Sequence, residues 1–120
     1  MEKFLLIVRE DIKLLKQNGD EGRYRNMRIM MKWVESLAES GSYAGGEPLV
    51  LTGKYVSRDD VLSDGPFIEA KEGISGYMFL QAENIEQAAS IAQTCPLVMQ
   101  GKMVLEVRPV MIVNNTLIDG

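Results

Sequence analysis

The chain has 120 residues, of which 46% are hydrophobic and 25% charged, and it carries a formal net charge of −4. This composition is that of a single globular domain. It argues against a nucleic-acid partner, since an acidic chain without a basic cluster attracts phosphate groups poorly. The sequence contains no histidine, so the commonest general base and metal ligand are both missing.

The cysteine content and the N-terminal sequence bear on the compartment. Cys95 is the only cysteine, which excludes an internal disulfide, and the apolar residues 4–8 are too few for a signal peptide or a membrane span. We therefore expect a cytoplasmic protein without a membrane partner. Residues 1–120 are expected to form one domain, with a core over about 3–110 and a C-terminal tail at 111–120.

The first third of the chain predicts a strand, a loop and a helix. Residues 3–8 form the strand, with apolar side chains on both faces, and the charged segment 11–22 forms the loop. Residues 23–40 are expected to be helical, with Trp33 packing on the flank of the apolar stripe. That stripe comprises Tyr24, Met27, Met31, Val34 and Ala38.

The middle of the chain predicts two further strand regions. After a loop at 44–48, residues 49–57 and 60–62 are expected to pair as a hairpin. Residues 75–82 alternate aromatic and aliphatic side chains and predict the next strand.

A second helix and a final strand complete the predicted elements. The helix begins after Asn84, an N-cap residue with Gln87 three positions on, and it ends before Pro96. Residues 103–109 form the last strand. The order of elements is that of a split βαβ unit, so we predict an α+β, ferredoxin-like sandwich with an antiparallel sheet.

The strand patterns also predict a partner. Two helices cover one face of such a sheet, yet the first strand carries Leu5 and Ile7 on the face opposite Phe4 and Leu6. Burying this second apolar face requires another sheet. We therefore expect a homodimer in which two sheets pack face to face as a dimeric α+β barrel.

The segment from Asp64 to Tyr77 carries the most specific motif of the chain. It begins with Asp-Gly-Pro-Phe at 64–67 and reaches Gly-Tyr at 76–77, at the start of a strand. Three further segments fit the same pattern, namely residues 3–7, 83–92 and 105–109. On these features, most of residues 3–110 resemble the YCII-related, DGPF-domain family.

This resemblance implies a ferredoxin-like fold, a dimeric α+β barrel and a ligand cleft between the sheet and the loops. Some relatives in the wider superfamily resemble small-molecule lyases or isomerases that carry a His–Asp pair, whereas this chain has no histidine. Members of the DGPF group are often encoded beside, or fused to, extracytoplasmic-function sigma factors. The resemblance therefore also implies an accessory or regulatory role in a sigma-factor system.

The motif supplies the candidate acid/base groups. Asp64 either caps the turn that Gly-Pro forms or acts as an acid/base group at the mouth of the cleft, and Phe67 either fills the core or contacts a ligand. Glu69 and Glu72 share a face if this segment is helical, so they could divide acid and base roles or hold a hard cation. The alternative is a solvated charged loop in which Lys71 neutralises its neighbours.

The last strand supplies the candidate anion site. Glu106 and Arg108 share one face, and charges on a partly buried face must pair or meet a ligand. They form either an ion pair, within the sheet or across the dimer, or a site in which Arg108 grips the carboxylate of a small organic acid. Tyr77 is expected in the core with its hydroxyl at a polar edge, where it could contact the ligand.

Two classes of function follow, and a structural protein without a ligand is the third alternative. The first is a dimeric protein that binds a small molecule or serves as an accessory protein, with ligand contacts from Arg108, Glu106, Tyr77, Phe67 and Lys71. The second is a lyase or isomerase in which Asp64 and Glu69 act as acid/base groups and Arg108 holds the anion. We favour the first class because acid/base groups are few, and we predict neither a cofactor nor a metal site.

Overall fold

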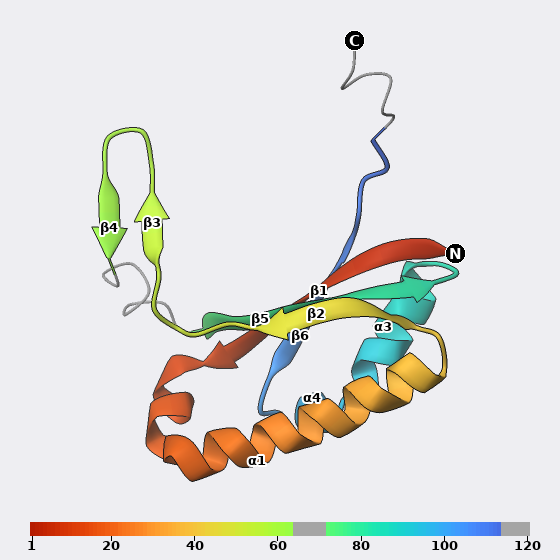
Figure 1. Ribbon diagram of the computed structural model, residues 1–120, viewed down its shortest axis with the longest axis horizontal. Coiled ribbons are helices and arrows are strands. Elements are labelled where there is room, and N and C mark those ends of the chain that lie inside the picture. The colour runs from red at the N-terminus through yellow and green to blue at the C-terminus, as the bar shows by residue number, and fades with distance from the viewer. Residues whose placement is uncertain (64–71, 114–120) are drawn as a thin grey trace.

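The computed structural model describes residues 1–63 and 72–113 (Figure 1). Its elements are β1 (Glu2–Asp11), α1 (Ile12–Glu39), β2 (Tyr43–Pro48), β3 (Lys54–Val56), β4 (Val61–Ser63), β5 (Glu72–Ala82), α3 (Ile85–Gln93), α4 (Pro96–Met99) and β6 (Val104–Pro109).

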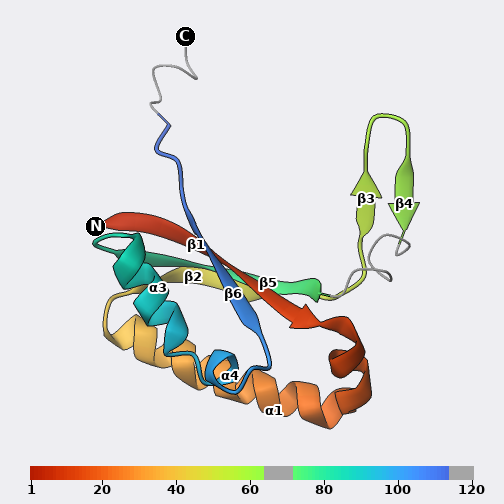
Figure 2. The ribbon, with the colours of Figure 1, turned by 180° about the vertical axis from the view of Figure 1, so that it is seen from behind.

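The main sheet has four strands in the order β2-β5-β1-β6, and every neighbouring pair is antiparallel. This order and the helices between the strands confirm the predicted ferredoxin-like α+β class. All helices lie on one side of the sheet, as Figures 1 and 2 show from opposite directions. The other side carries no helix in the described part of the chain. The expected dimer stays a prediction.

The core lies between the helices and the inward side chains of β1 and β5. In each of these strands, alternate residues point toward the helices, and Phe4, Leu6 and Leu80 are at most 1% exposed. Full burial of one such side chain contributes roughly 1.5–3 kcal/mol. From the helices, Trp33 is buried and its indole Nε1–H donates to the hydroxyl of Thr94 at 3.0 Å. This bond connects α1 to the end of α3.

Helix α1 begins much earlier than predicted, and the loop expected at 11–22 is wrong. Asp11 caps the helix, because its side chain accepts a hydrogen bond from the backbone N–H of Leu14 at 3.2 Å. Gly19 interrupts the helix with φ of 64°, a conformation that glycine adopts without strain. The residues that suggested a loop therefore mark a kink between two helical segments.

The apolar stripe predicted for α1 is only partly buried. Tyr24 is 64% exposed and Met31 57% exposed, whereas Trp33 and Leu37, one turn apart, face the core. The apolar surface of this helix is wider than the contact that the sheet offers, so its methionine edge stays uncovered. Trp33 has the packing role expected from the sequence, but it packs in the core and not on the flank of the helix.

The second strand of the main sheet lies in the segment predicted as a loop, 44–48. A residue larger than glycine does not fit at position 46 of β2, because a Cβ on Gly46 would lie only 2.5 Å from the carbonyl oxygen of Tyr77. Gly45 has φ of 109° at the irregularity that precedes it. The predicted hairpin forms in a shorter version, as the separate pair β3–β4.

The second half of the described chain follows the prediction more closely. Asn84 accepts a hydrogen bond from the backbone N–H of Gln87 at 2.9 Å, and the Gln87 side chain accepts one from the backbone N–H of Glu83. Asn84 thus caps the helix as predicted, and the Gln87 side chain reaches back to the residue before the cap, one position further than in a standard capping box. The short helix α4, which starts at Pro96 and buries Leu97, was not predicted. No helix in the described residues is long and apolar enough to cross a membrane.

Candidate functional site

A groove of about 700 Å³ lies between α1 and the edge of the sheet formed by β2 and β5. The α1 wall consists chiefly of Met27, Met30, Met31 and Val34, of which the first and third are exposed and the other two are partly buried against the core. The sheet side contributes Tyr43 and Met78, and the segment after β2 adds Leu49, Val50 and Leu51. Methionine side chains are flexible and polarizable, so such walls adapt to ligands of different shape.

One end of this groove is polar. Glu10 follows Phe4, Leu6 and Val8 on the helix side of β1, and its carboxylate accepts a hydrogen bond from the hydroxyl of Ser75. Val8 pairs with Gly76 but Arg9 pairs with Ile74, so Ser75 is the extra residue of a β-bulge. Bulges redirect side chains next to functional sites. Both Glu10 and Ser75 line the groove.

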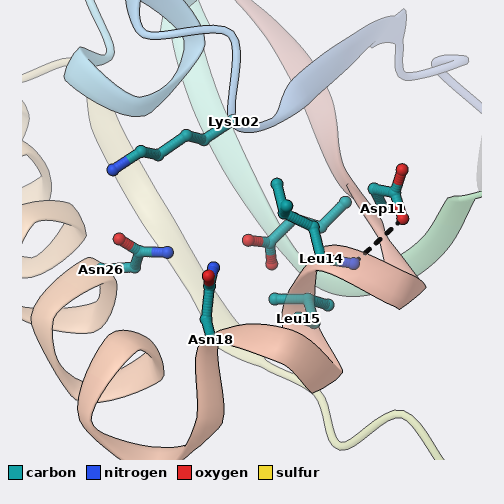
Figure 3. Close-up of a pocket in the computed structure, with 7 residues that line it drawn as sticks. Asp11, Leu14, Leu15, Asn18, Asn26 and Lys102 are labelled. Atoms are coloured by element: carbon teal, nitrogen blue, oxygen red, sulfur yellow. Dashed lines mark hydrogen bonds between the residues drawn. The ribbon is translucent and has the colours of Figure 1, made fainter.

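A small hollow adjoins this polar end, and Figure 3 shows the side chains around it. The hollow has about 10 Å³ of free volume, which is the space of one water molecule. It is lined by Glu10, Asn18, Asn26 and Lys102, besides Asp11, Leu14 and Leu15. Glu10, Leu15 and Asn26 line the groove as well, so the two spaces share a wall.

Tyr77 lies where the groove meets the sheet edge. Its hydroxyl donates to the carboxylate of Glu47 at 3.2 Å, and its ring packs edge-on against Phe79. The negative charge and hydrogen bond of Glu47 raise the pKa of the Tyr77 hydroxyl. Tyr77 borders the groove, but its ring lies with Phe79 and its sheet partner Ile7 on the helix-free face. Its hydroxyl is at a polar edge, as the sequence indicated, whereas the core position expected for its ring is wrong, because Tyr77 belongs to the outward-facing set of β5.

Arg108 and Glu106 lie on the helix-free face, away from the groove. Glu106 accepts hydrogen bonds from Arg9 at 2.9 Å and from Arg108 at 3.2 Å. These two hydrogen bonds hold the pKa of the Glu106 carboxyl below its ordinary value. This is the ion pair within the sheet that the sequence left open as one alternative. The head group of Arg108 remains exposed beside it, so an anion bound to Arg108 would lie on this face.

Four predicted site residues lie outside the described residues, namely Asp64, Phe67, Glu69 and Lys71. Their roles as acid/base groups or ligand contacts stay predictions. Sequence reasoning missed Glu10, Ser75 and Lys102. The signal for Glu10 was present, because it continues the inward alternation of Phe4, Leu6 and Val8. The bulge at Ser75 and the approach of Lys102 depend on the folded chain.

Other chemistry is sparse in the described chain. No group of three or more Cys, Asp or Glu side chains there is placed to hold a metal ion. Cys95 is fully buried beside the Met30 sulfur, and burial raises the pKa of its thiol. A thiol in such a site is a poor nucleophile, so Cys95 has a packing role in the core.

The sheet order and the groove together define an α+β protein of the ferredoxin-like class with a candidate small-molecule site. The sequence matches the YCII-related domain over residues 3–113, and the chain belongs to this family. The family resemblance inferred from the motifs is thereby confirmed. The narrower assignment to the DGPF group stays a prediction.

One solved structure that is similar to this chain is 5-chloro-2-hydroxyhydroquinone dehydrochlorinase from Burkholderia phenoliruptrix AC1100, in complex with 2,5-dihydroxybenzoquinone. The two share 14% sequence identity with a TM-score of 0.59, over 95% of this chain and 97% of that chain. At this identity the similarity shows a common fold. A comparison with curated proteins gave no match.

Proposed function

We propose that this protein binds a small, largely apolar organic molecule in the groove between α1 and the β2–β5 edge. The observation that carries the proposal is the groove itself, with a volume of about 700 Å³. Pockets that bind small molecules have volumes of roughly 300–1,000 Å³, mostly apolar walls and a few polar groups. A groove with a methionine wall and a few polar groups, among them Glu10, Arg23 and Glu35, fits this description.

The proposal includes a homodimer formed through the helix-free face. Leu5, Ile7 and Phe79 lie half-buried on this face, and Val104 is 50% exposed beside them. The β3–β4 hairpin and the segment 110–113 both project on the side away from the helices (Figure 1). Their exposed apolar side chains offer further contacts to a second sheet, namely Tyr55, Val56, Val61, Leu62, Met111 and Ile112.

Lyase or isomerase activity is the second candidate, and the similarity to a dehydrochlorinase favours it. In that case Asp64 and Glu69 would act as acid/base groups on a ligand in the groove. Arg108 would hold an anion only on the opposite face of its own sheet, so the predicted clamp requires a separate site. An accessory role in a sigma-factor system rests on the family resemblance and is compatible with ligand binding.

The methionines of the chain can serve as NMR probes in a binding test. Of its eight methionines, Met27, Met30, Met31, Met78 and Met103 line the groove, and Met1, Met99 and Met111 do not. Methionine labelled with ¹³C at the ε-methyl group gives one NMR signal for each. On titration with small aromatic compounds, we expect the groove methyl signals to shift and the other three to stay in place.

A pair of variants completes this test. Met31→Lys places a charge on the groove wall, and Met99→Lys makes the same change on α4, outside the groove. Both side chains are exposed, at 57% and 74%, so neither change disturbs the core. We expect binding to be lost in Met31→Lys and kept in Met99→Lys. Shifts that involve all eight methyls equally, or none at all, would contradict the proposed site.

A further inference from the structure

The polar end of the groove limits which ligands it accepts, and this inference rests on the proposed function. The apolar walls contact the hydrocarbon part of a ligand and place no requirement on the polar group that it carries. At the end formed by Glu10, Leu15 and Asn26, however, the groove shares its wall with the small hollow. A ligand that fills the groove therefore brings one of its groups to this end.

Glu10 determines what that group must offer. A carboxylate accepts hydrogen bonds and donates none. The hydroxyl of Ser75 already donates to one of its oxygens, Oε2. The other oxygen, Oε1, has capacity for a donor from the ligand. A pure hydrocarbon that covered Glu10 would remove its water without replacing it, which is unfavourable for a charged group.

The surrounding groups require an acceptor as well. Lys102 carries only donors, and Asn18 and Asn26 carry amide groups that donate and accept. These side chains reach the hollow from three different segments, as Figure 3 shows. A ligand oxygen at this end would accept from Lys102 or an amide. A ligand carboxylate, by contrast, would face the charge of Glu10 and of the neighbouring Asp11.

We propose that the groove selects a ring-sized apolar molecule that carries a hydroxyl group, with that hydroxyl donating to Glu10 and accepting from Lys102. A hydroxyl group satisfies both requirements because it donates once and accepts twice. The structure thus favours a neutral phenol or alcohol over the small organic acid that the sequence predicted on the basis of Arg108. Arg108 lies on the opposite face of the sheet and does not contribute to this selection.

Three probes with the same ring separate these possibilities, namely phenol, toluene and benzoate, each titrated against the ¹³C-methionine signals. We expect the tightest binding for phenol. Replacing the charged acceptor in Glu10→Gln should weaken phenol binding about tenfold, since a charge-assisted hydrogen bond becomes a neutral one. The same change should alter the affinity for toluene by no more than about twofold. It should strengthen benzoate binding, because it removes a like charge. The matched control is Glu39→Gln, an exposed carboxylate outside the groove.

A second variant guards against a folding defect in Glu10→Gln. Lys102 is exposed, so Lys102→Met is expected to fold normally and to weaken phenol binding several-fold without affecting toluene. Lys32→Met, on the outer side of α1, is its control. Each variant is folded if the eight wild-type Met signals keep their positions in the free protein, apart from the one new signal that each Lys→Met substitution adds.

The outcomes separate this inference from the proposed function. If no probe shifts the groove methyl signals, the proposed function itself fails. If toluene binds as tightly as phenol, or if Glu10→Gln weakens all three probes equally, the groove binds ligands without selecting a hydroxyl group. If benzoate binds tightest, the organic acid predicted from the sequence is correct and the inference is overturned.

Discussion

The two faces of the sheet are built from the same strands but present different surfaces. On the helix-covered side, alternate residues of β1 and β5 form a buried core, and a largely apolar groove lies beside it, between α1 and the β2–β5 edge. On the helix-free side, half-buried aliphatic and aromatic residues lie among paired charges such as Arg9 and Glu106. A concave surface suits a small molecule, whereas an open face with its charges already paired suits a protein partner.

The difference teaches that hydrophobic alternation does not by itself distinguish core from interface. Both Leu5 and Leu6 belong to the same apolar run, yet Leu6 is 0% exposed and Leu5 is half-buried. The helices cover only one of them. The apolar residues that stay exposed, on α1 and on the helix-free face, are those that a ligand or a partner would cover.

The largest expected effect comes from a pair of substitutions at these neighbouring positions. Leu6→Ala should lower the free energy of unfolding by about 2–5 kcal/mol, because it leaves a cavity in the core. Leu5→Ala should cost less, roughly 1–2 kcal/mol, in dilute protein, since part of its side chain is already in contact with water. Urea unfolding of both variants measures these losses.

Measuring both stability losses at several protein concentrations distinguishes the two variants further. The loss for Leu5→Ala should rise with concentration, because the proposed dimer buries Leu5 further, while the loss for Leu6→Ala should stay constant. Equal losses for the two variants in dilute protein would contradict the distinction between a covered and an open face.

The second prediction concerns the association state. Ile7 pairs with Tyr77 on one side and with Glu106 on the other, at the middle of the helix-free face. Ile7→Asp adds a negative charge there, next to Glu106, and burying that charge in an interface is strongly unfavourable. Sedimentation velocity should show a dimer for the wild type at micromolar concentration and a monomer for Ile7→Asp.

Met99→Asp on the helix side is the control and should remain dimeric. A wild type that sediments as a monomer at this concentration would exclude the proposed dimer. The Ile7→Asp monomer should still show ligand-induced shifts of the groove methyl signals, because the groove lies on the opposite face. Loss of those shifts would mean that the dimer helps to form the binding site.

The sequence predicted the central strands and the second helix because their signals are local. Strands β1 and β5 alternate inward and outward side chains, and Asn84 caps the helix through the backbone N–H of Gln87, which needs no tertiary context. Strand β2 was missed because Gly45 and Gly46 are unusual in strands. The reason for glycine at position 46 appears only in the folded chain, where β5 passes so close that a side chain would not fit.

The candidate site was less accessible to sequence reasoning. The Met-rich stripe of α1 was predicted but its exposure was not, since periodicity shows which residues share a face but not how much of that face the sheet covers. The proximity of Glu106 and Arg108 could be predicted, because both lie on one strand two residues apart. That Glu10 and Lys102 line the same hollow could not, since it depends on how β6 and the turn before it approach the end of β1.

The smallest expected effect tests the charged network of the helix-free face. The folded state binds a proton at Glu106 more weakly than the unfolded state, because Arg9 and Arg108 lower its pKa. The network therefore contributes stability above the ordinary glutamate pKa of about 4.3, and this contribution is lost as the pH falls through the lowered folded value. Glu106→Gln should accordingly be slightly less stable than wild type at pH 7, and the difference should vanish on acidification.

Urea unfolding across this pH range measures the difference, and Glu39→Gln is the matched exposed control. High salt should reduce the effect at neutral pH, since the network is open to solvent in the single chain. A difference that does not change with pH would assign the loss to packing instead of charge. In the proposed dimer the same groups are removed from water, so the Glu106→Gln difference should be larger in dimeric wild type than in the Ile7→Asp monomer. This last comparison tests whether the proposed partner covers the charged network of the helix-free face.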